Sequence, residues 1–217
     1  MSTDTAPNIS KTDIIRPAKL AHVVIKTTRY SELIDWYRFV LGAEIAHQNP
    51  MVTFLYYDDE HHRLAVINGK GLLPNLRGAA GVDHFAFTYA TLGDLLSTYE
   101  RLKQHGIEPV WPINHGGTTS LYYRDPDSNV IELQVDNFPT RAETNEFLQD
   151  GRFAINPVGI DIDPDEWLER HRAGVPDEDL TRWPEIMKPR TTPPPTAYLG
   201  RIGGAMLALA GRLKRRR

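Results

Sequence analysis

The chain has 217 residues, of which 41% are hydrophobic, and it carries a formal net charge of -3 and no cysteine. This length and apolar content fit one domain with appendages, and the slightly acidic balance argues against a nucleic-acid-binding protein. The absence of cysteine excludes disulfides, thiolate metal sites and a cysteine nucleophile, and it fits a reducing cytoplasm. No apolar run reaches the length of a membrane-spanning helix, and the N-terminal residues do not resemble a signal peptide. We therefore expect a cytoplasmic protein with no transmembrane segment.

Two segments of the chain resemble one another, which indicates an internal duplication. The run LAHVVIKTTRYSELIDWYRFVLGAEI around His22 resembles VDHFAFTYATLGDLLSTYERLKQHGIEPV around His84. Farther along, LYYDDEHHRLAVI resembles LYYRDPDSNVIEL. Two copies are too few for a solenoid of stacked repeats, so they predict a pair of similar modules.

Each copy is predicted to form a strand, a helix and then three strands. In the first copy, apolar residues at helical spacing predict a helix over residues 30–41, which Gly42 would end in a left-handed conformation. The strands of this copy are predicted over residues 19–27, 43–48, 51–58 and 62–68. In the second copy, the helix is predicted over residues 92–105 and the strands over 81–89, 107–113, 118–124 and 129–136.

The composition changes beyond residue 137, which suggests appendages around a central domain. A proline-rich stretch predicts an extended linker, and the last residues combine apolar positions at helical spacing with a basic end. Such a tail is usually solvated, and contact with an anionic membrane surface is the weaker alternative. The expected divisions are an N-terminal arm at 1–17, the paired domain at 18–137, an extension packing on it at 138–183 with a short helix near 164–172, the linker at 184–197 and the basic amphipathic tail at 198–217.

His22, His84 and Glu132 stand out as a candidate set of metal ligands. The two histidines occupy equivalent positions in the two copies, and all three residues lie in predicted strands. A single histidine in an apolar strand is more often a core residue. A repeated pair, together with a carboxylate that would be costly to bury alone, favours a metal site. Two imidazoles and one carboxylate leave coordination positions open, as in Fe(II) sites that bind substrate and dioxygen.

Paired βαβββ modules with this ligand set resemble the vicinal oxygen chelate superfamily and, within it, the type I extradiol ring-cleaving dioxygenases. The resemblance covers residues 18–137 and implies an α+β fold of two paired modules around one metal ion, with Fe(II) preferred and Mn(II) as the alternative. The implied activity is the insertion of both atoms of O2 into a catecholic substrate, next to its pair of hydroxyl groups. Small members of this superfamily commonly dimerise, so the resemblance also implies a homodimer or a higher homo-oligomer.

The resemblance further implies three catalytic residues. The segment HHRLAV matches the family segment that holds the acid/base histidine, which places this role on His62 rather than His61. His115 lies in the loop where the family has a histidine that contacts the substrate, and Tyr122 lies where it has a tyrosine that hydrogen-bonds a substrate oxygen. Histidine suits acid/base work because its pKa lies near neutral pH. The simpler interpretations are a solvated turn for His62, a loop cap for His115 and cross-strand packing for Tyr122.

Other members of the superfamily provide the alternatives. Glyoxalase I-like and epimerase-like members need four protein ligands, whereas the alignment of the two copies places Val66 opposite Glu132, and valine cannot bind a metal. A metal-dependent thiol transferase uses the same three ligands and stays an alternative, as does a ligand-binding member without turnover. Gly117 departs from the polar residue that is frequent in related enzymes, which leaves the shape of the substrate open. The apolar candidates for the substrate pocket are Phe54, Trp111, Phe138 and Phe147.

Overall fold

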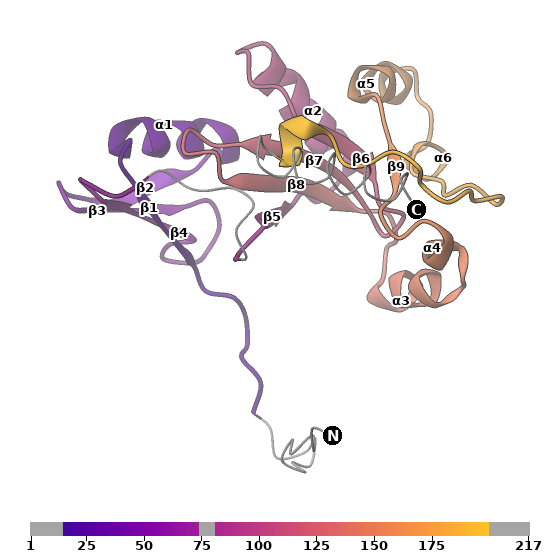
Figure 1. Ribbon diagram of the computed structural model, residues 1–217, viewed down its shortest axis with the longest axis horizontal. Helices are drawn as coiled ribbons and strands as arrows, with labels where there is room; N and C mark the ends of the chain where they lie inside the picture. Colours follow the sequence, from indigo (N-terminus) through magenta and orange to yellow (C-terminus); the bar gives the residue numbers. More distant parts are fainter. Residues whose placement is uncertain (1–14, 74–80, 200–217) are drawn as a thin grey trace, which may run out of the picture.

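A computed structural model describes residues 15–73 and 81–199 of the chain. The expectations for most of the N-terminal arm, for the segment between the two copies and for the tail beyond residue 199 therefore lie outside the described residues. Two β-sheets lie side by side, and helices α1 and α2 cover the same side of both (Figure 1). Within the described ranges, we find no helix long and apolar enough to cross a membrane.

The first module is a four-stranded sheet of order β1-β4-β3-β2 with one helix. β1 runs parallel to β4, and the other neighbours are antiparallel. The expected strand over 19–27 is shorter than predicted, because the carbonyl oxygens of Leu20 and Ala21 accept hydrogen bonds from the Arg63 side chain. The elements are β1 (Val23–Thr27), α1 (Tyr30–Leu41), β2 (Glu44–Gln48), β3 (Val52–Tyr56) and β4 (Leu64–Asn68).

The second module repeats this arrangement, as the duplication predicts. Its sheet has the order β5-β8-β7-β6-β9, with β5 parallel to β8. The edge strand β9 (Ile160–Asp161) comes from the chain beyond the second module. The strand expected over 107–113 begins only at Trp111 and runs on to Asn114. The elements are β5 (His84–Thr88), α2 (Leu92–Lys103), β6 (Trp111–Asn114), β7 (Thr118–Arg124) and β8 (Val130–Asp136).

One end of each helix has a cap that can be read in the sequence. The side chain of Thr91 accepts a hydrogen bond of 3.1 Å from the Asp94 amide and so caps the start of α2. Gly42 ends α1 with a φ of 66°, a left-handed conformation that costs glycine little. The expected helix over 30–41 and its glycine cap are therefore confirmed. The buried residues of α1 recur at helical spacing, as Leu33, Ile34, Tyr37 and Val40.

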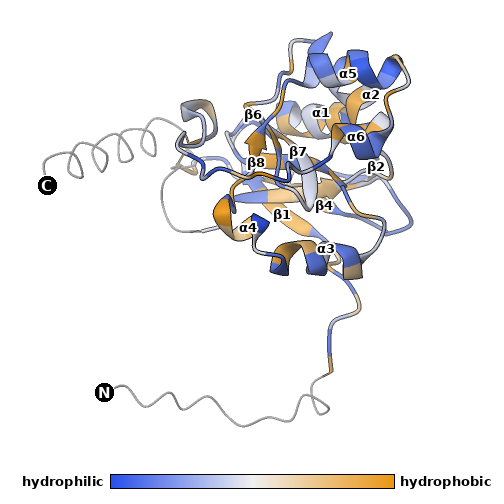
Figure 2. Ribbon diagram, turned by 90° about the vertical axis from the view of Figure 1, so that its right-hand side faces the viewer, coloured by the Kyte–Doolittle hydropathy of each residue, from blue (hydrophilic) through white to orange (hydrophobic). Residues whose placement is uncertain are grey.

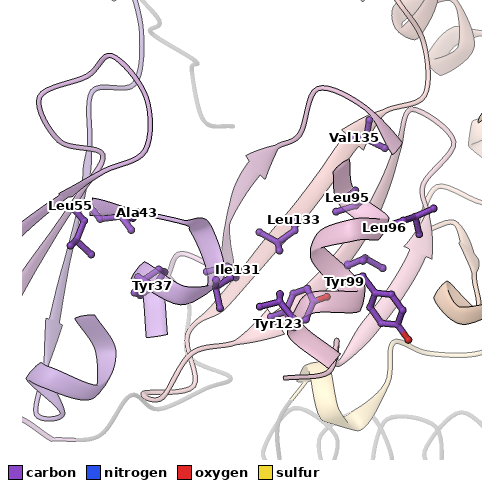
Figure 3. Packing of buried hydrophobic residues seen from close by; sticks show 14 of the residues in the cluster. Tyr37, Ala43, Leu55, Leu95, Leu96, Tyr99, Tyr123, Ile131, Leu133 and Val135 are labelled. Carbon is purple, nitrogen blue, oxygen red and sulfur yellow. The ribbon is translucent and has the colours of Figure 1, made fainter. Parts of the chain in front are cut away.

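One hydrophobic cluster lies between the helices and the two sheets (Figure 3). It joins Tyr37 and Leu55 of the first module to Tyr123 and Ile131 of the second, and each such buried side chain contributes on the order of 1.5–3 kcal/mol. The Tyr37 hydroxyl also donates a hydrogen bond of 3.1 Å to Asp125 Oδ2 of the second module. The two modules therefore share one core, and the α+β fold of paired modules is confirmed.

The chain beyond the second module adds short helices and one further strand. Its elements are α3 (Arg141–Gln149), α4 (Arg152–Ile155), β9 (Ile160–Asp161), α5 (Pro164–Arg172) and α6 (Asp177–Leu180). The helix expected near 164–172 is confirmed, and the Asp163 side chain caps it. α3 and α4 lie on the opposite side of the sheets from α2 and α5 (Figure 1). α5 is mostly hydrophilic, whereas α4 is mostly hydrophobic (Figure 2).

Candidate metal centre and active site

The sheet face that α1 and α2 leave uncovered carries the candidate site of the second module. Side chains alternate along β8, so Ile131 and Leu133 join the core and Glu132 points to the opposite face. Glu132 is nevertheless only 5% exposed. It lies opposite Tyr122 in the antiparallel pairing of β7 with β8.

His84 and Glu132 lie in direct contact, as the ligand hypothesis requires. His84 begins β5, and its Nε2 atom lies 3.0 Å from Glu132 Oε2. Burial opposes ionisation of Glu132, but hydrogen bonds with His84, Ser120 and Tyr122 outweigh it and leave the pKa of the carboxyl below its usual value. The same contact with Glu132, supported by Asp83, raises the pKa of His84. In the metal-free protein the contact therefore favours the imidazolium–carboxylate form of this pair.

His115 and Tyr122 lie beside this pair and bind one another. His115 Nε2 lies 3.0 Å from the Tyr122 hydroxyl, and Nδ1 faces the carbonyl oxygen of Val158. Because a carbonyl oxygen only accepts, Nδ1 carries the proton. The single phenolic proton of Tyr122 has two alternative acceptors, His115 Nε2 and the Glu132 carboxylate. Burial lowers the pKa of His115, and burial together with the Glu132 charge raises the pKa of Tyr122. Both groups are therefore neutral near pH 7, and we name His84, Glu132, Tyr122 and His115 the His84 group.

His22 and His62 form a second group on the first module. His22 lies just before β1 and is exposed, with its ring centroid 4.4 Å from that of His62. His62 also stacks on Phe54 at 4.6 Å, and its Nδ1 lies 2.6 Å from His61 Nδ1. Burial and the neighbouring His22 and His61 lower the pKa of His62. His62 is therefore held between aromatic rings in a form able to accept a proton.

A cavity of about 420 Å³ connects the two groups, since both His22 and His84 line it. This volume lies within the range of small-molecule sites. However, among the residues that the structure describes, no three His, Asp or Glu side chains are close enough together to hold a metal ion. The structure thus brings His84 and Glu132 together and leaves His22 beside His62, so the complete ligand set stays a prediction. The remaining lining residues are Leu20, Ala21, Val23, Tyr57, Asp58, Arg63, Leu64, Phe85, Ala86 and Phe87.

The strand register corrects the residue that corresponds to Glu132 in the first module. Val24 lies two residues after His22 and pairs with Ala65, just as Ala86 pairs with Glu132 in the second module. Ala65 is therefore the counterpart of Glu132, and the alignment with Val66 was wrong by one residue. Such a slip reverses the face of a side chain, and Val66 indeed belongs to the core under the helices. Alanine has no ligand atom, so the fourth ligand is still missing.

Two of the four aromatic residues expected near the substrate lie against the candidate site. Trp111 stacks on Tyr122 at 5.4 Å, and Phe54 stacks on His62. Phe138 and Phe147 instead pack on one another at 5.5 Å.

The loop after His115 depends on a glycine. Gly116 has a φ of 86°, and a Cβ atom there would lie 2.2 Å from Phe147 Cζ. The neighbouring Gly117 has more room, since a Cβ atom would meet only Thr144 Cγ2, at 3.4 Å. The fold therefore fixes Gly116 more tightly than Gly117.

Three residues that sequence reasoning missed also contact the His84 group. Asp83 Oδ2 lies 2.8 Å from His84 Nδ1, and its signal was its place next to a candidate ligand. Ser120 bonds Glu132, and its signal was a spacing of two from Tyr122, which puts both on one strand face. Tyr198 lies 3.5 Å from His84 Nδ1 but 114 residues away in the chain, so no local pattern could have found it.

Comparisons with known proteins agree with this fold. Residues 19–133 match the family described as the Glyoxalase/Bleomycin resistance protein/Dioxygenase superfamily. Biphenyl-2,3-diol 1,2-dioxygenase 2 of Rhodococcus globerulus is 46% identical over 164 residues, which cover 75% of this chain and 86% of that protein. Biphenyl-2,3-diol 1,2-dioxygenase 3 of the same organism is 43% identical over 165 residues, which cover 75% and 87%. The crystal structure of lactoylglutathione lyase from Agrobacterium tumefaciens has a TM-score of 0.45 at 20% identity and covers 55% of this chain and 94% of its own. The chain therefore belongs to the Glyoxalase/Bleomycin resistance protein/Dioxygenase superfamily.

Proposed function

We propose that this protein is an extradiol ring-cleavage dioxygenase, which inserts O2 into a catecholic substrate next to its pair of hydroxyl groups. A superfamily fold alone does not choose a reaction, since one fold supports many. The observation that carries the proposal is the His84 group, a buried carboxylate paired with a partly exposed imidazole, with a tyrosine and a histidine beside them. Relatives named as biphenyl-2,3-diol 1,2-dioxygenases, at 46% and 43% identity, support the same reaction.

Fe(II) is the proposed metal, with Mn(II) as the alternative. The contact between His84 Nε2 and Glu132 Oε2 joins one nitrogen and one oxygen donor of the kinds that these ions accept. His22 is the proposed third ligand because it lines the same cavity as His84. The proposal requires the His22 ring to turn from His62 toward His84. When bound, the metal would orient the diol and dioxygen on its open positions and favour loss of the hydroxyl protons.

Tyr122 and His115 are proposed to bind the substrate. The Tyr122 hydroxyl keeps its proton because its pKa is raised, so it can donate to a substrate oxygen in place of its present partner. His115 is neutral because burial lowers its pKa. We therefore assign it a hydrogen-bonding role toward the substrate.

His62 is the proposed acid/base catalyst. Its lowered pKa leaves the imidazole neutral near pH 7, and a neutral imidazole can accept a proton from a substrate hydroxyl. It stacks against His22, which lines the cavity, so it lies one side chain away from the proposed substrate space. The protonated ring can then return a proton later in the reaction.

The test is oxygen uptake by protein loaded with Fe(II) under anaerobic conditions. The substrates are catechol, its 3- and 4-methyl derivatives, 2,3-dihydroxybiphenyl, 1,2-dihydroxynaphthalene and homoprotocatechuate, and we expect stoichiometric uptake with yellow ring-opened products. Iron bound without uptake on any of these diols would contradict the proposal and favour a thiol transferase or a ligand-binding protein. Oxygen uptake with some of these diols and not others would also begin to define the substrate. We propose that the substrate is an aromatic diol and that the protein acts in the cytoplasm.

The ligand assignment has its own test, which does not depend on substrate. The variants His22→Ala, His84→Ala and Glu132→Ala should each lose stoichiometric iron, because each removes one of three proposed ligands. His47→Ala is the matched control, since His47 is exposed and contacts Asn49 in the first module. Retention of iron by all three variants would show that the site lies elsewhere. The expected homodimer or higher oligomer is checked on the same samples by light scattering.

A further inference from the structure

A tyrosine outside the two modules lies against the candidate metal centre. Tyr198 is only 8% exposed, and its ring lies 4.7 Å from that of Trp111 and 5.1 Å from that of Tyr122. Its hydroxyl donates to Asp83 Oδ2 and lies 3.5 Å from His84 Nδ1. Tyr198 therefore reaches the side of His84 that faces away from Glu132.

The main chain around Tyr198 is fastened to the second sheet. Arg124, at the end of β7, donates from Nε to the Ala197 carbonyl oxygen at 2.6 Å and from Nη2 to that of Tyr198 at 2.8 Å. Upstream, Arg190 binds Asp161 of β9 through two hydrogen bonds of 2.8 and 2.9 Å. Figure 1 shows this segment, in yellow, running back across the second module. Its placement over the site is therefore built into the fold.

The contact with Asp83 gives the tyrosine a chemical role. Asp83 Oδ2 accepts from His84 Nδ1, which leaves Nε2 to face Glu132 and a metal. A carboxylate behind a ligand imidazole fixes the orientation of the ring and strengthens it as a donor. The Asp83 side chain is 60% exposed, so water competes for it. The Tyr198 hydroxyl donates to the same oxygen and holds the carboxylate behind the imidazole.

We propose that Tyr198 is a positioning residue of the metal centre, which acts through Asp83 to hold His84 Nε2 toward the metal. Its ring also forms one side of the site, where it packs on Trp111 and Tyr122. The proposal rests on the proposed function, since it takes His84 as a metal ligand. It extends the site beyond residues 19–133, the part that matches the family.

The test compares Fe(II) affinities by anaerobic equilibrium dialysis. Tyr198→Phe keeps the ring and removes only the hydroxyl, so it should bind Fe(II) about tenfold more weakly, the usual cost of losing a partner behind a ligand. The unfolding temperature of the metal-free variant should match that of the wild type. Tyr56→Phe is the matched control, because it removes a hydroxyl that donates to Glu44 Oε2 at 2.8 Å in the first module. It should bind Fe(II) as the wild type does.

A second variant separates the proposed route from a general loss of packing. Asp83→Asn should also weaken Fe(II) binding, and adding Tyr198→Phe to it should cause no further loss, because both changes break one chain of hydrogen bonds. Equal Fe(II) affinity of Tyr198→Phe and the wild type would overturn this inference alone. Additive losses in the double variant would overturn the route through Asp83. A wild-type protein that binds no Fe(II) would overturn the proposed function, and this inference with it.

Discussion

The pair of His84 and Glu132 should give the metal-free protein a pH-dependent stability that Glu132→Gln removes. The pKa of His84 is raised above 6.5, first by its bond to Glu132, so this contribution is complete below pH 6.5 and is lost as the pH rises through the folded value. Despite burial, the pKa of Glu132 is lowered below 4.5, so its contribution is complete above pH 4.5 and is lost as the pH falls. Between about pH 4.5 and 6.5, the stabilising contributions of His84 and Glu132 are therefore both present.

The size of the effect follows from the contact. A hydrogen bond to a charged group contributes about 1.5–3 kcal/mol and a neutral one about 0.5–1.5 kcal/mol, so the substitution should cost about 1 kcal/mol in this pH window. The side chains of His84 and Glu132 are 30% and 7% exposed, which argues for the lower end of that range. With a urea slope of about 2 kcal/mol per M, the unfolding midpoint should fall by about 0.5 M.

The assay is urea unfolding of metal-free wild type and Glu132→Gln, followed by tryptophan fluorescence. We expect the midpoints to differ by about 0.5 M at about pH 5.5 and to approach one another at alkaline pH, above the raised pKa of His84. Asp83 still contacts His84 in the variant, so only the difference between the two proteins measures the part due to Glu132. The same midpoint difference at both pH values would refute the ion pair.

Three further predictions concern single side chains. His62→Phe should bind Fe(II) normally but lose about 10²–10⁴-fold in kcat, as for loss of a general acid/base, and an unchanged rate of oxygen uptake would rule out that role. Gly116→Ala should destabilise the fold by about 1–3 kcal/mol and so lower the unfolding temperature, because the new Cβ would overlap Phe147 and the backbone there is left-handed. An unaltered Tm would show that the loop relaxes freely. Tyr37→Phe should destabilise by about 1–3 kcal/mol in urea unfolding, because buried Asp125 loses a hydrogen-bond donor, and no loss would mean that water replaces it.

Local patterns predicted most of the fold, because helices and strands depend on neighbours in sequence. The helix over 30–41 follows from apolar spacing and a glycine stop, and the duplication predicted that the second module would repeat the first. β9 has only two residues, Ile160 and Asp161, and so leaves no periodic signal. It forms because β6 presents a free edge, and that is a property of the folded sheet.

Sequence patterns likewise predicted some contacts of the candidate site and missed others. His84 and Glu132 were predicted to meet, and they do, because parallel pairing of β5 with β8 places them on neighbouring strands. His22 was predicted in a strand but precedes it, since Arg63 binds the carbonyl groups on its N-terminal side. Tyr198 could not be predicted, because its place depends on how Arg124 fastens a distant segment. Long-range contacts of this kind become visible only in the folded chain.

The register of the two modules has an evolutionary consequence. Ala65 occupies the place that Glu132 fills in the other copy, and the codons for alanine and glutamate can differ by a single base. A mutation there would add a second carboxylate to the same face and offer a fourth ligand to the proposed metal. Position 65 is only 4% exposed, so a glutamate there would have to displace the side chains packed around it. In a duplicated fold, the number of available metal ligands can thus depend on one residue in the copy that does not carry the carboxylate.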